Sequence, residues 1–277
     1  MRQSAPPLTV IEPRKGWVPA DLKEIWNYRE LLYFLTKRDI QVRYKQTVLG
    51  GLWAIIQPAF TMLVFTLFFG RLAKMPSDGI PYPIFVYAGL LPWTYFANAV
   101  AASGNSLVGS ANLITKVYFP RIMIPASAAL AGLLGFAVAV LVLAVLMIYY
   151  QLLPGANIFV FPVLVALTFL SAVGTGLWLS ALNVQFRDIR YVIPFVIQIW
   201  LFVSPVIYPV SLVRENLQWI LAINPMAGVI HAYRASLLGH QLIDWPLLGI
   251  STMMIIALFL SGLYYFRRME RTFADVI

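Results

Sequence analysis

Long uncharged apolar runs alternate with short charged segments along this chain. Residues 46–70 contain no Asp, Glu, Lys or Arg, and further uncharged runs lie between Asp78 and Lys116 and from Ile122 to Phe186. A helix needs about 20 predominantly apolar residues to cross the hydrocarbon layer of a membrane. Each run is long enough for at least one crossing, so the pattern predicts a helical membrane protein.

The run from Ile122 to Phe186 is too long for one crossing. Turn-forming residues from Leu152 to Asn157, which include a Pro-Gly pair, divide it into two halves. We therefore expect a helical hairpin here. The predicted fold class is an all-α integral membrane protein with six transmembrane helices, over residues 52–72, 84–106, 125–150, 159–183, 191–208 and 246–266.

The segment 209–245, between the fifth and sixth predicted helices, mixes charged and apolar residues. Its charges make it too polar to cross a membrane, and its many leucines and isoleucines make it too apolar for a solvated loop. The charged side chains that decide this are Arg214, Glu215 and Arg234. Asn224-Pro225 divides the segment, so we predict two short re-entrant helices on the outer side. Cysteines placed at Gln218 and Ser236 should then be reachable from outside.

Composition and charge agree with this interpretation. The 277-residue chain is 61% hydrophobic and 11% charged, with a mean hydropathy of +0.80; soluble chains are about 45–50% apolar and about 25% charged. The net charge is +9, but the basic residues gather near the ends of the predicted helices, which disfavours a nucleic-acid partner. With six crossings, 16 of the 20 basic residues fall on the side of the two termini. Both termini are therefore predicted to be cytoplasmic.

The distribution of reactive side chains disfavours several functions. All 11 carboxylates and both histidines lie outside the predicted helices or at their margins, which disfavours an ion-coupled pump. His231 and His240 are not spaced as a metal-binding pair, and we expect no metal site and no catalytic cluster. The chain has no G-x-x-x-x-G-K-[ST] phosphate loop. It is not predicted to be an enzyme, and energy for transport must enter from a partner.

Two segments on the predicted cytoplasmic side are candidates for contacts. Residues 21–46 begin with a helix-capping pattern and continue with apolar and basic residues, which predicts an amphipathic helix on the inner membrane surface. The loop after the second predicted helix, residues 111–124, predicts a short helix whose apolar side chains need a pocket on another protein. The residues expected to contact this partner protein are Asn112, Lys116, Tyr118, Phe119, Pro120 and Arg121.

Several short motifs in order resemble one transporter family. The run Lys37–Thr47, the loop 112–125 and the run Asn183–Asp188 are similar to the permease subunits of polysaccharide and polyol-phosphate ABC exporters. Further similar patterns are Ser204–Tyr208, Asn224-Pro225 with Arg234, and the tail from Arg268 to Ile277. The resemblance extends from about residue 22 to the C-terminus.

This resemblance implies a homodimer in the bacterial inner membrane, with each subunit docked on one of two copies of a cytoplasmic ABC ATPase. ATP and Mg would bind that ATPase, and this chain would bind no cofactor. The cargo would be a lipid-linked polysaccharide of the O-antigen or teichoic-acid type. Two alternatives stay open: a permease of the same architecture that exports a drug or a lipid, and a membrane enzyme that acts on lipid-linked sugar.

The resemblance also implies a division of the chain into a tail at 1–20, an interface helix at 21–46 that borders the cytoplasmic entrance, and a membrane domain at 47–277 whose segment 209–245 forms the exit gate. The entrance residues would be Trp26, Arg38, Asp39, Arg43 and Tyr44. The channel or gate residues would be Trp200, Tyr208, Trp219, Asn224, Pro225 and Arg234. Aromatic rings offer flat faces to sugar rings, although an interfacial belt of aromatic residues is the alternative.

Overall fold

The computed structural model of the chain describes residues 26–45, 52–117, 119–239 and 242–273. Every regular element within these ranges is helical. The elements are α2 (Arg29–Tyr44), α3 (Trp53–Phe65), η2 (Thr66–Leu72), α4 (Tyr82–Gly109), α5 (Ala111–Lys116), α6 (Met123–Tyr149), η3 (Ala156–Val160), α7 (Phe161–Gln185), α8 (Ile189–Val203), η4 (Val210–Leu212), α9 (Glu215–Ile223), α10 (Pro225–Leu238), α11 (Trp245–Met269) and η5 (Glu270–Thr272).

Five helices are long and apolar enough to cross a membrane, and they match five of the six predicted spans. They cover Trp53–Leu72, Tyr82–Gly109, Met123–Tyr149, Asn157–Gln185 and Trp245–Thr272. The remaining prediction, residues 191–208, corresponds to α8, which is apolar but has only 15 residues. At 1.5 Å per residue α8 is about 22 Å long, shorter than the hydrocarbon layer of about 30 Å.

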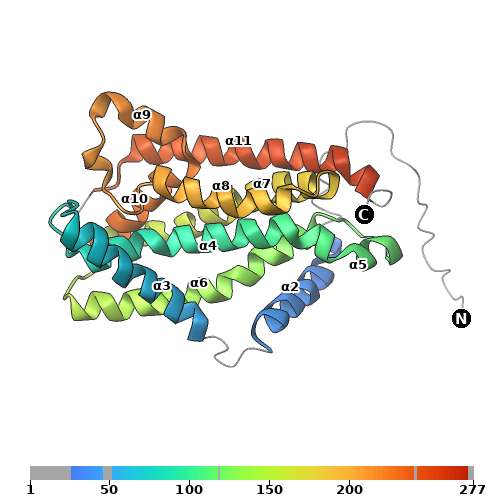
Figure 1. The fold of residues 1–277 in the computed structure, drawn as a ribbon, viewed down its shortest axis with the longest axis horizontal. Helices are drawn as coiled ribbons and strands as arrows, with labels where there is room; N and C mark the ends of the chain where they lie inside the picture. The colour runs from blue at the N-terminus through green and yellow to red at the C-terminus, as the bar shows by residue number, and fades with distance from the viewer. Residues whose placement is uncertain (1–25, 46–51, 118, 240–241, 274–277) are drawn as a thin grey trace, which may run out of the picture.

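The long helices lie side by side, with α4 at the centre of the bundle (Figure 1). Most of α4 is buried, and it packs against both α6 and α7. Glycines allow the close approaches: a Cβ atom on Gly176 of α7 would lie 2.5 Å from the Cβ of Ser103 on α4. Small residues at helix crossings are typical of membrane bundles, where close backbone contact replaces the hydrophobic effect.

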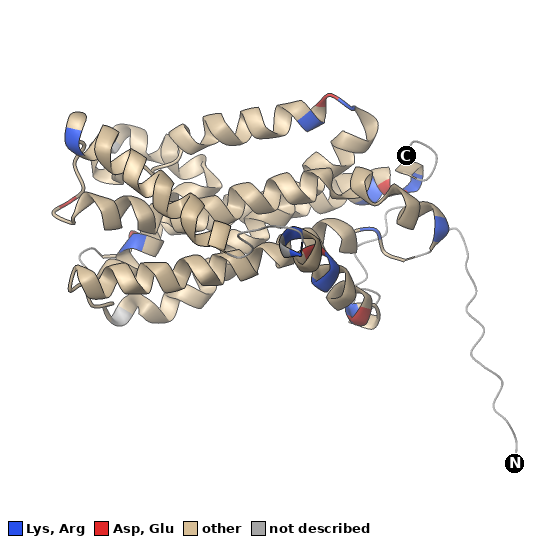
Figure 2. Cartoon of the chain, turned by 60° about the horizontal axis from the view of Figure 1, so that its bottom comes forward, with Lys and Arg blue, Asp and Glu red and all other residues tan. Residues whose placement is uncertain are grey.

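The bundle has two ends that differ in their elements. One end carries α5, the end of α11 and the nearby α2, and we call it the α5 end; the opposite end carries η2, α9 and α10, and we call it the α10 end (Figure 1). Figure 2 shows that most charged residues lie near these two ends and along α2, with few between them. This distribution is expected of helices whose middle parts contact lipid.

The segment between α8 and α11 folds as predicted into two short helices, α9 and α10, which are divided at Asn224 and Pro225. The Asn224 side chain accepts a hydrogen bond from the backbone N–H of Met226 at 3.0 Å and so caps α10. The helix ends at Gly239, whose φ of +69° favours glycine. Every described residue of α10 from Pro225 to Leu238 except His231 is buried.

The N-terminal helix α2 covers most of the predicted segment 21–46, while residues 21–25 and 46 lie outside the described residues. It packs against α6. Leu35 is buried there at 5% exposure, whereas Tyr33, Phe34 and Val42 are exposed by 62%, 62% and 75%. Apolar side chains thus remain uncovered on α2, which agrees with a helix that rests on a membrane surface.

Candidate functional site

The guanidinium of Arg234 forms the centre of a buried polar cluster at the α10 end. Arg234 is 2% exposed. Its Nε donates to the carbonyl of Phe85 on α4 at 3.1 Å, its Nη2 to the carbonyl of Val206 at 2.6 Å, and its Nη1 to the carbonyls of Pro205 at 2.7 Å and Tyr208 at 3.4 Å. The sequence-based prediction concerned burial of this charge in lipid; here the protein itself satisfies the guanidinium.

These hydrogen bonds complete the pairing of the irregular backbone that follows α8. The carbonyl of Ser204 accepts from the N–H of Val206 at 2.7 Å, and the carbonyl of Ile207 accepts from the hydroxyl of Tyr82 at 2.8 Å. With the three carbonyls bound by Arg234, all carbonyls from Ser204 to Tyr208 are paired. Non-helical backbone at membrane depth is tolerated only when such groups are satisfied inside the protein.

Two residues of α4, Phe85 and Gly89, make room for the Arg234 side chain and contact it. The guanidinium lies over the ring of Phe85, 3.7 Å from its centroid, as in a cation–π contact. Gly89 leaves the space that the guanidinium fills, since a Cβ atom there would lie 2.5 Å from Nη2.

Asn224 forms a second polar cluster, which joins α8, α10 and α11. Its Oδ1 accepts from the indole N–H of Trp200 at 2.9 Å as well as from Met226, and its Nδ2 donates to Oγ of Ser204 at 2.9 Å. The Ser251 hydroxyl of α11 lies 3.3 Å from the Asn224 carbonyl and accepts from the N–H of Gly228 at 3.0 Å. The ring of Trp200 also packs edge-on against Phe96 of α4.

The structure therefore brings four of the six predicted channel or gate residues into the anchoring of the α9–α10 segment: Trp200, Asn224, Pro225 and Arg234. Trp219 differs, because 60% of its side chain is exposed on α9. Tyr208 is half-buried, and its hydroxyl donates to the Val203 carbonyl at 3.1 Å. Phe85, Gly89 and Ser251 were not identified from the sequence as part of these clusters. The one available signal was Gly89, a glycine inside the apolar helix α4.

The predicted contact loop at the α5 end has a shorter helix than expected. The helix ends at Lys116, and α6 begins at Met123. The prediction that Phe119 is an apolar side chain in need of a partner's pocket is wrong: it is 4% exposed and packs into this chain's own core. Pro120 is also buried, while Asn112 and Lys116 are exposed. Tyr118 lies outside the described residues.

Arg121 ties this loop to the end of the last helix. Its backbone N–H donates to Oε1 of Glu270 at 3.0 Å, and its Nη1 donates to the Glu270 backbone carbonyl. The other carboxylate oxygen of Glu270 pairs with Arg267 of α11 at 3.1 Å. The loop and the C-terminal part of α11 are therefore held together at the α5 end.

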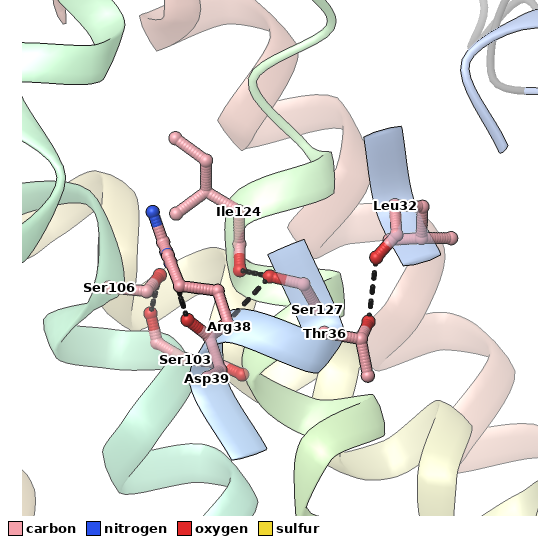
Figure 3. Close-up of polar contacts among 8 residues, drawn as sticks. All are labelled: Leu32, Thr36, Arg38, Asp39, Ser103, Ser106, Ile124 and Ser127. Atoms are coloured by element: carbon pink, nitrogen blue, oxygen red, sulfur yellow. Dashed lines mark hydrogen bonds and ion pairs between the residues drawn. The ribbon is translucent and has the colours of Figure 1, made fainter. Parts of the chain in front are cut away.

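The predicted entrance residues lie on α2 and around its first turn. Asp39 pairs with Arg38 at 2.9 Å. The Ser127 hydroxyl on α6 lies 3.1 Å from Oδ2 of Asp39 and 2.9 Å from the Ile124 carbonyl, and both oxygens can accept its proton (Figure 3). Trp26 is 68% exposed beneath the Arg29 guanidinium. Asp39 thus helps to hold α2 on α6.

Arg43, near the end of α2, lines a cavity of about 390 Å³ between α3, α4 and α6. The side chain of Tyr44 lies outside the described part of the chain. Among the described residues no group of three or more His, Asp or Glu side chains could hold a metal ion.

Known proteins resemble this chain over most of its length. The sequence model of the ABC-2 type transporter family matches residues 30–238. The chain is 31% identical over 260 residues to the O-antigen export system permease protein RfbA of Myxococcus xanthus, covering 92% of this chain and 98% of that protein. It is 28% identical over 249 residues to a protein of the same name from Klebsiella pneumoniae, covering 90% and 95%.

The polysialic acid transport protein KpsM of Escherichia coli is a more distant relative, 23% identical over 234 residues, with 84% of this chain and 91% of that protein covered. The family match includes Asn224, Arg234 and the loop at the α5 end. Because the family match covers residues 30–238 of the 277-residue chain and the Myxococcus xanthus relative covers 92% of it, this chain belongs to the ABC-2 type transporter family.

Proposed function

We propose that this chain is the membrane-spanning pore subunit of an ATP-driven exporter that moves a lipid-linked polysaccharide outward across the bacterial inner membrane. The observation that carries the proposal is the similarity, along nearly the whole chain, to permeases named for O-antigen export. A second relative named for polysialic acid transport also points to a saccharide polymer as the cargo.

Six crossings are part of this proposal, with α8 as the fifth. The ends of α7 and α11 lie at the α5 end, and α11 starts at the α10 end (Figure 1). The chain between them must therefore pass once from the α5 end to the α10 end, and α8 is the helix that does so. The segment from Ser204 to Tyr208 continues the path of α8 beyond its 15 residues, and the backbone carbonyls of this segment are hydrogen-bonded.

Energy would come from a separate ATPase, which membership in the ABC-2 family implies, with ATP and Mg bound there. We place its docking surface at the α5 end, on the exposed residues Asn112, Lys116 and Val117 of the loop. This end would be cytoplasmic, with both termini on the same side. Buried Phe119 and the Arg121–Glu270 contact would transmit force from the loop to α6 and α11.

The pore would form between two copies of this chain, each with one ATPase. Exposed apolar side chains on α3 and α8 support such a contact, since only 11% of the span at Trp53–Leu72 is buried within one copy. At the outer side, α9 and α10 would be re-entrant helices that cover the pore mouth. Trp219 and Tyr208 would face the cargo, while Arg234 and Asn224 would hold the segment in place.

The experiment that tests this function is complementation. A bacterial strain that lacks an O-antigen export permease receives this chain together with its partner ABC ATPase. Restored polysaccharide on the cell surface is the expected result. Polysaccharide that stays in the cytoplasm, although the chain is present in the membrane and bound to an active ATPase, would overturn the proposed cargo.

A further inference from the structure

The cavity that Arg43 lines extends from the end of α2 to the middle of the bundle. Its volume is about 390 Å³. Its walls come from α3 through Trp53 and Gln57, and from the middle of α4 through Asn98. Trp53 is 51% exposed at the start of α3. A tryptophan at a helix end is typical of the headgroup level of a membrane, so the Arg43 side of the cavity lies at this level and its far side lies deeper.

Four hydrophilic side chains line the cavity and are free to bind: Arg43, Gln57, Thr94 and Asn98. No hydrogen bond or ion pair joins these side chains to another residue in the described ranges. Arg38, on the same helix as Arg43, is instead paired with Asp39. An unpartnered cation at the membrane boundary needs an anion or water, and a ligand that supplies an anion has a clear advantage.

The cavity has aromatic walls and no acidic side chain among its described lining residues. The hydroxyl of Tyr87 donates to the Ala139 carbonyl, and that of Tyr95 donates to the Ala129 carbonyl, each at 3.2 Å. Both hydroxyls are thus occupied by α6, so the tyrosines contribute mainly ring surface to the cavity. Among the described lining residues there is no Asp or Glu. One guanidinium, two amides, the Thr94 hydroxyl and aromatic rings define the chemistry of the cavity.

We propose that this cavity binds the phosphate group of a membrane lipid, with Arg43 as the charged ligand and the amides of Gln57 and Asn98 as further donors. Guanidinium forks match phosphate oxygens in bidentate pairs, which are strong when partly shielded from water. Basic pockets between transmembrane helices are recognised lipid headgroup sites. The apolar and aromatic remainder of the cavity offers a surface for the hydrocarbon chain next to the phosphate.

Two kinds of lipid carry this chemistry: a bulk anionic phospholipid and a polyprenyl phosphate carrier. The site requires only that these helices lie in a membrane, and it does not require that the chain exports polysaccharide. Lipid binding can be measured on the isolated full-length chain without any ATPase. Failure of this inference is therefore distinguishable from failure of the proposed function, which complementation measures.

The test is native mass spectrometry of the purified chain, titrated with phosphatidylglycerol, with undecaprenyl monophosphate and with uncharged diacylglycerol. We expect Arg43→Gln to weaken binding of a phosphate lipid roughly tenfold, because one charge-assisted contact is lost. Asn98→Ala should weaken it roughly threefold. The matched control is Lys37→Gln, which removes a charge from an exposed position of the same helix outside the cavity.

The outcomes distinguish the two lipid sources from each other and show whether the cavity is a phosphate site. Weaker binding of both phosphate lipids supports a shared phosphate site, and weaker binding of only one supports the site and identifies its ligand. Thermal unfolding of Arg43→Gln should match the wild type, since the residue is exposed. Wild-type affinity in Arg43→Gln, an equal loss in Lys37→Gln, or equally tight binding of diacylglycerol would overturn the proposal.

Discussion

The guanidinium of Arg234 on α10 fills a space that Gly89 on α4 leaves open. A Cβ atom at Gly89 would lie 2.5 Å from Nη2 of Arg234 and 3.1 Å from the Val206 carbonyl that Nη2 binds. One glycine therefore allows a charged side chain to enter the bundle and pair the irregular backbone after α8. The consequence is that α4, the end of α8 and α10 are joined at one point.

Gly89→Ala should lower the stability of the protein by about 1–3 kcal/mol, the usual cost of forcing a side chain into a packed interior. The measurement is thermal unfolding in detergent. Gly109→Ala is the matched control, because the same substitution near the end of the same helix meets open space and should be nearly neutral. Equal melting temperatures for the two variants would contradict the role of Gly89.

Arg234→Met should be more damaging than Gly89→Ala. It removes every donor to three carbonyls of the segment after α8, and each buried acceptor left unpaired costs about 1–3 kcal/mol. Arg234→Lys should fall between Met and the wild type, because an ammonium keeps the charge but lacks the planar fork. Arg214→Met, at an exposed position on the same side, is the control; a similar loss there would rule out a specific role for Arg234.

Trp200→Phe should cost about 1 kcal/mol, since it removes the indole N–H that binds Asn224 but keeps an aromatic ring next to Phe96. Asn224→Ala should cost more, because it also removes the cap of α10 and the contact with Ser204. A double-mutant cycle measures the coupling between the two residues. Strict additivity of the two losses would show that the hydrogen bond does not contribute.

The spans were predictable from the sequence because charge exclusion acts on each helix separately. Runs without charge identified five spans closely, and Asn224-Pro225 identified the division between α9 and α10. The partners of Arg234 were not predictable. They lie on residues 85 and 205–208, far from it in sequence, and backbone carbonyls have no sequence signature. The same reason explains Phe119: an aromatic residue in a loop looks exposed until the tertiary fold covers it.

At the α5 end, the two kinds of loop residue should give separable phenotypes. Phe119→Ala should destabilise the protein by about 3–5 kcal/mol, as expected for truncation of a buried aromatic side chain. Lys116→Glu should leave stability within about 0.5 kcal/mol, because its side chain is exposed, but should weaken ATPase binding and reduce export. Thermal unfolding and co-purification of the ATPase check the two expectations. Normal export in Lys116→Glu would remove this residue from the docking surface.

The last prediction concerns the side of the membrane on which α9 lies. The chain contains no cysteine, so single cysteines can be labelled with a membrane-impermeant thiol reagent. Ser236 is unsuitable as a reporter, contrary to the expectation from sequence, because its side chain is fully buried. Asn216 on α9 is exposed and replaces it, next to the half-buried Gln218.

Asn216→Cys should react in intact cells, and Lys116→Cys should react only after the membrane is opened. The reason is parity: α3, α4, α6, α7 and α8 precede α9, and an odd number of crossings places α9 opposite to a cytoplasmic N-terminus. Ser236→Cys is the burial control and should react on neither side. If α8 did not cross, Asn216→Cys and Lys116→Cys would be labelled from the same side, and the fifth crossing, the outer position of α9 and its part in an exit gate would all be wrong.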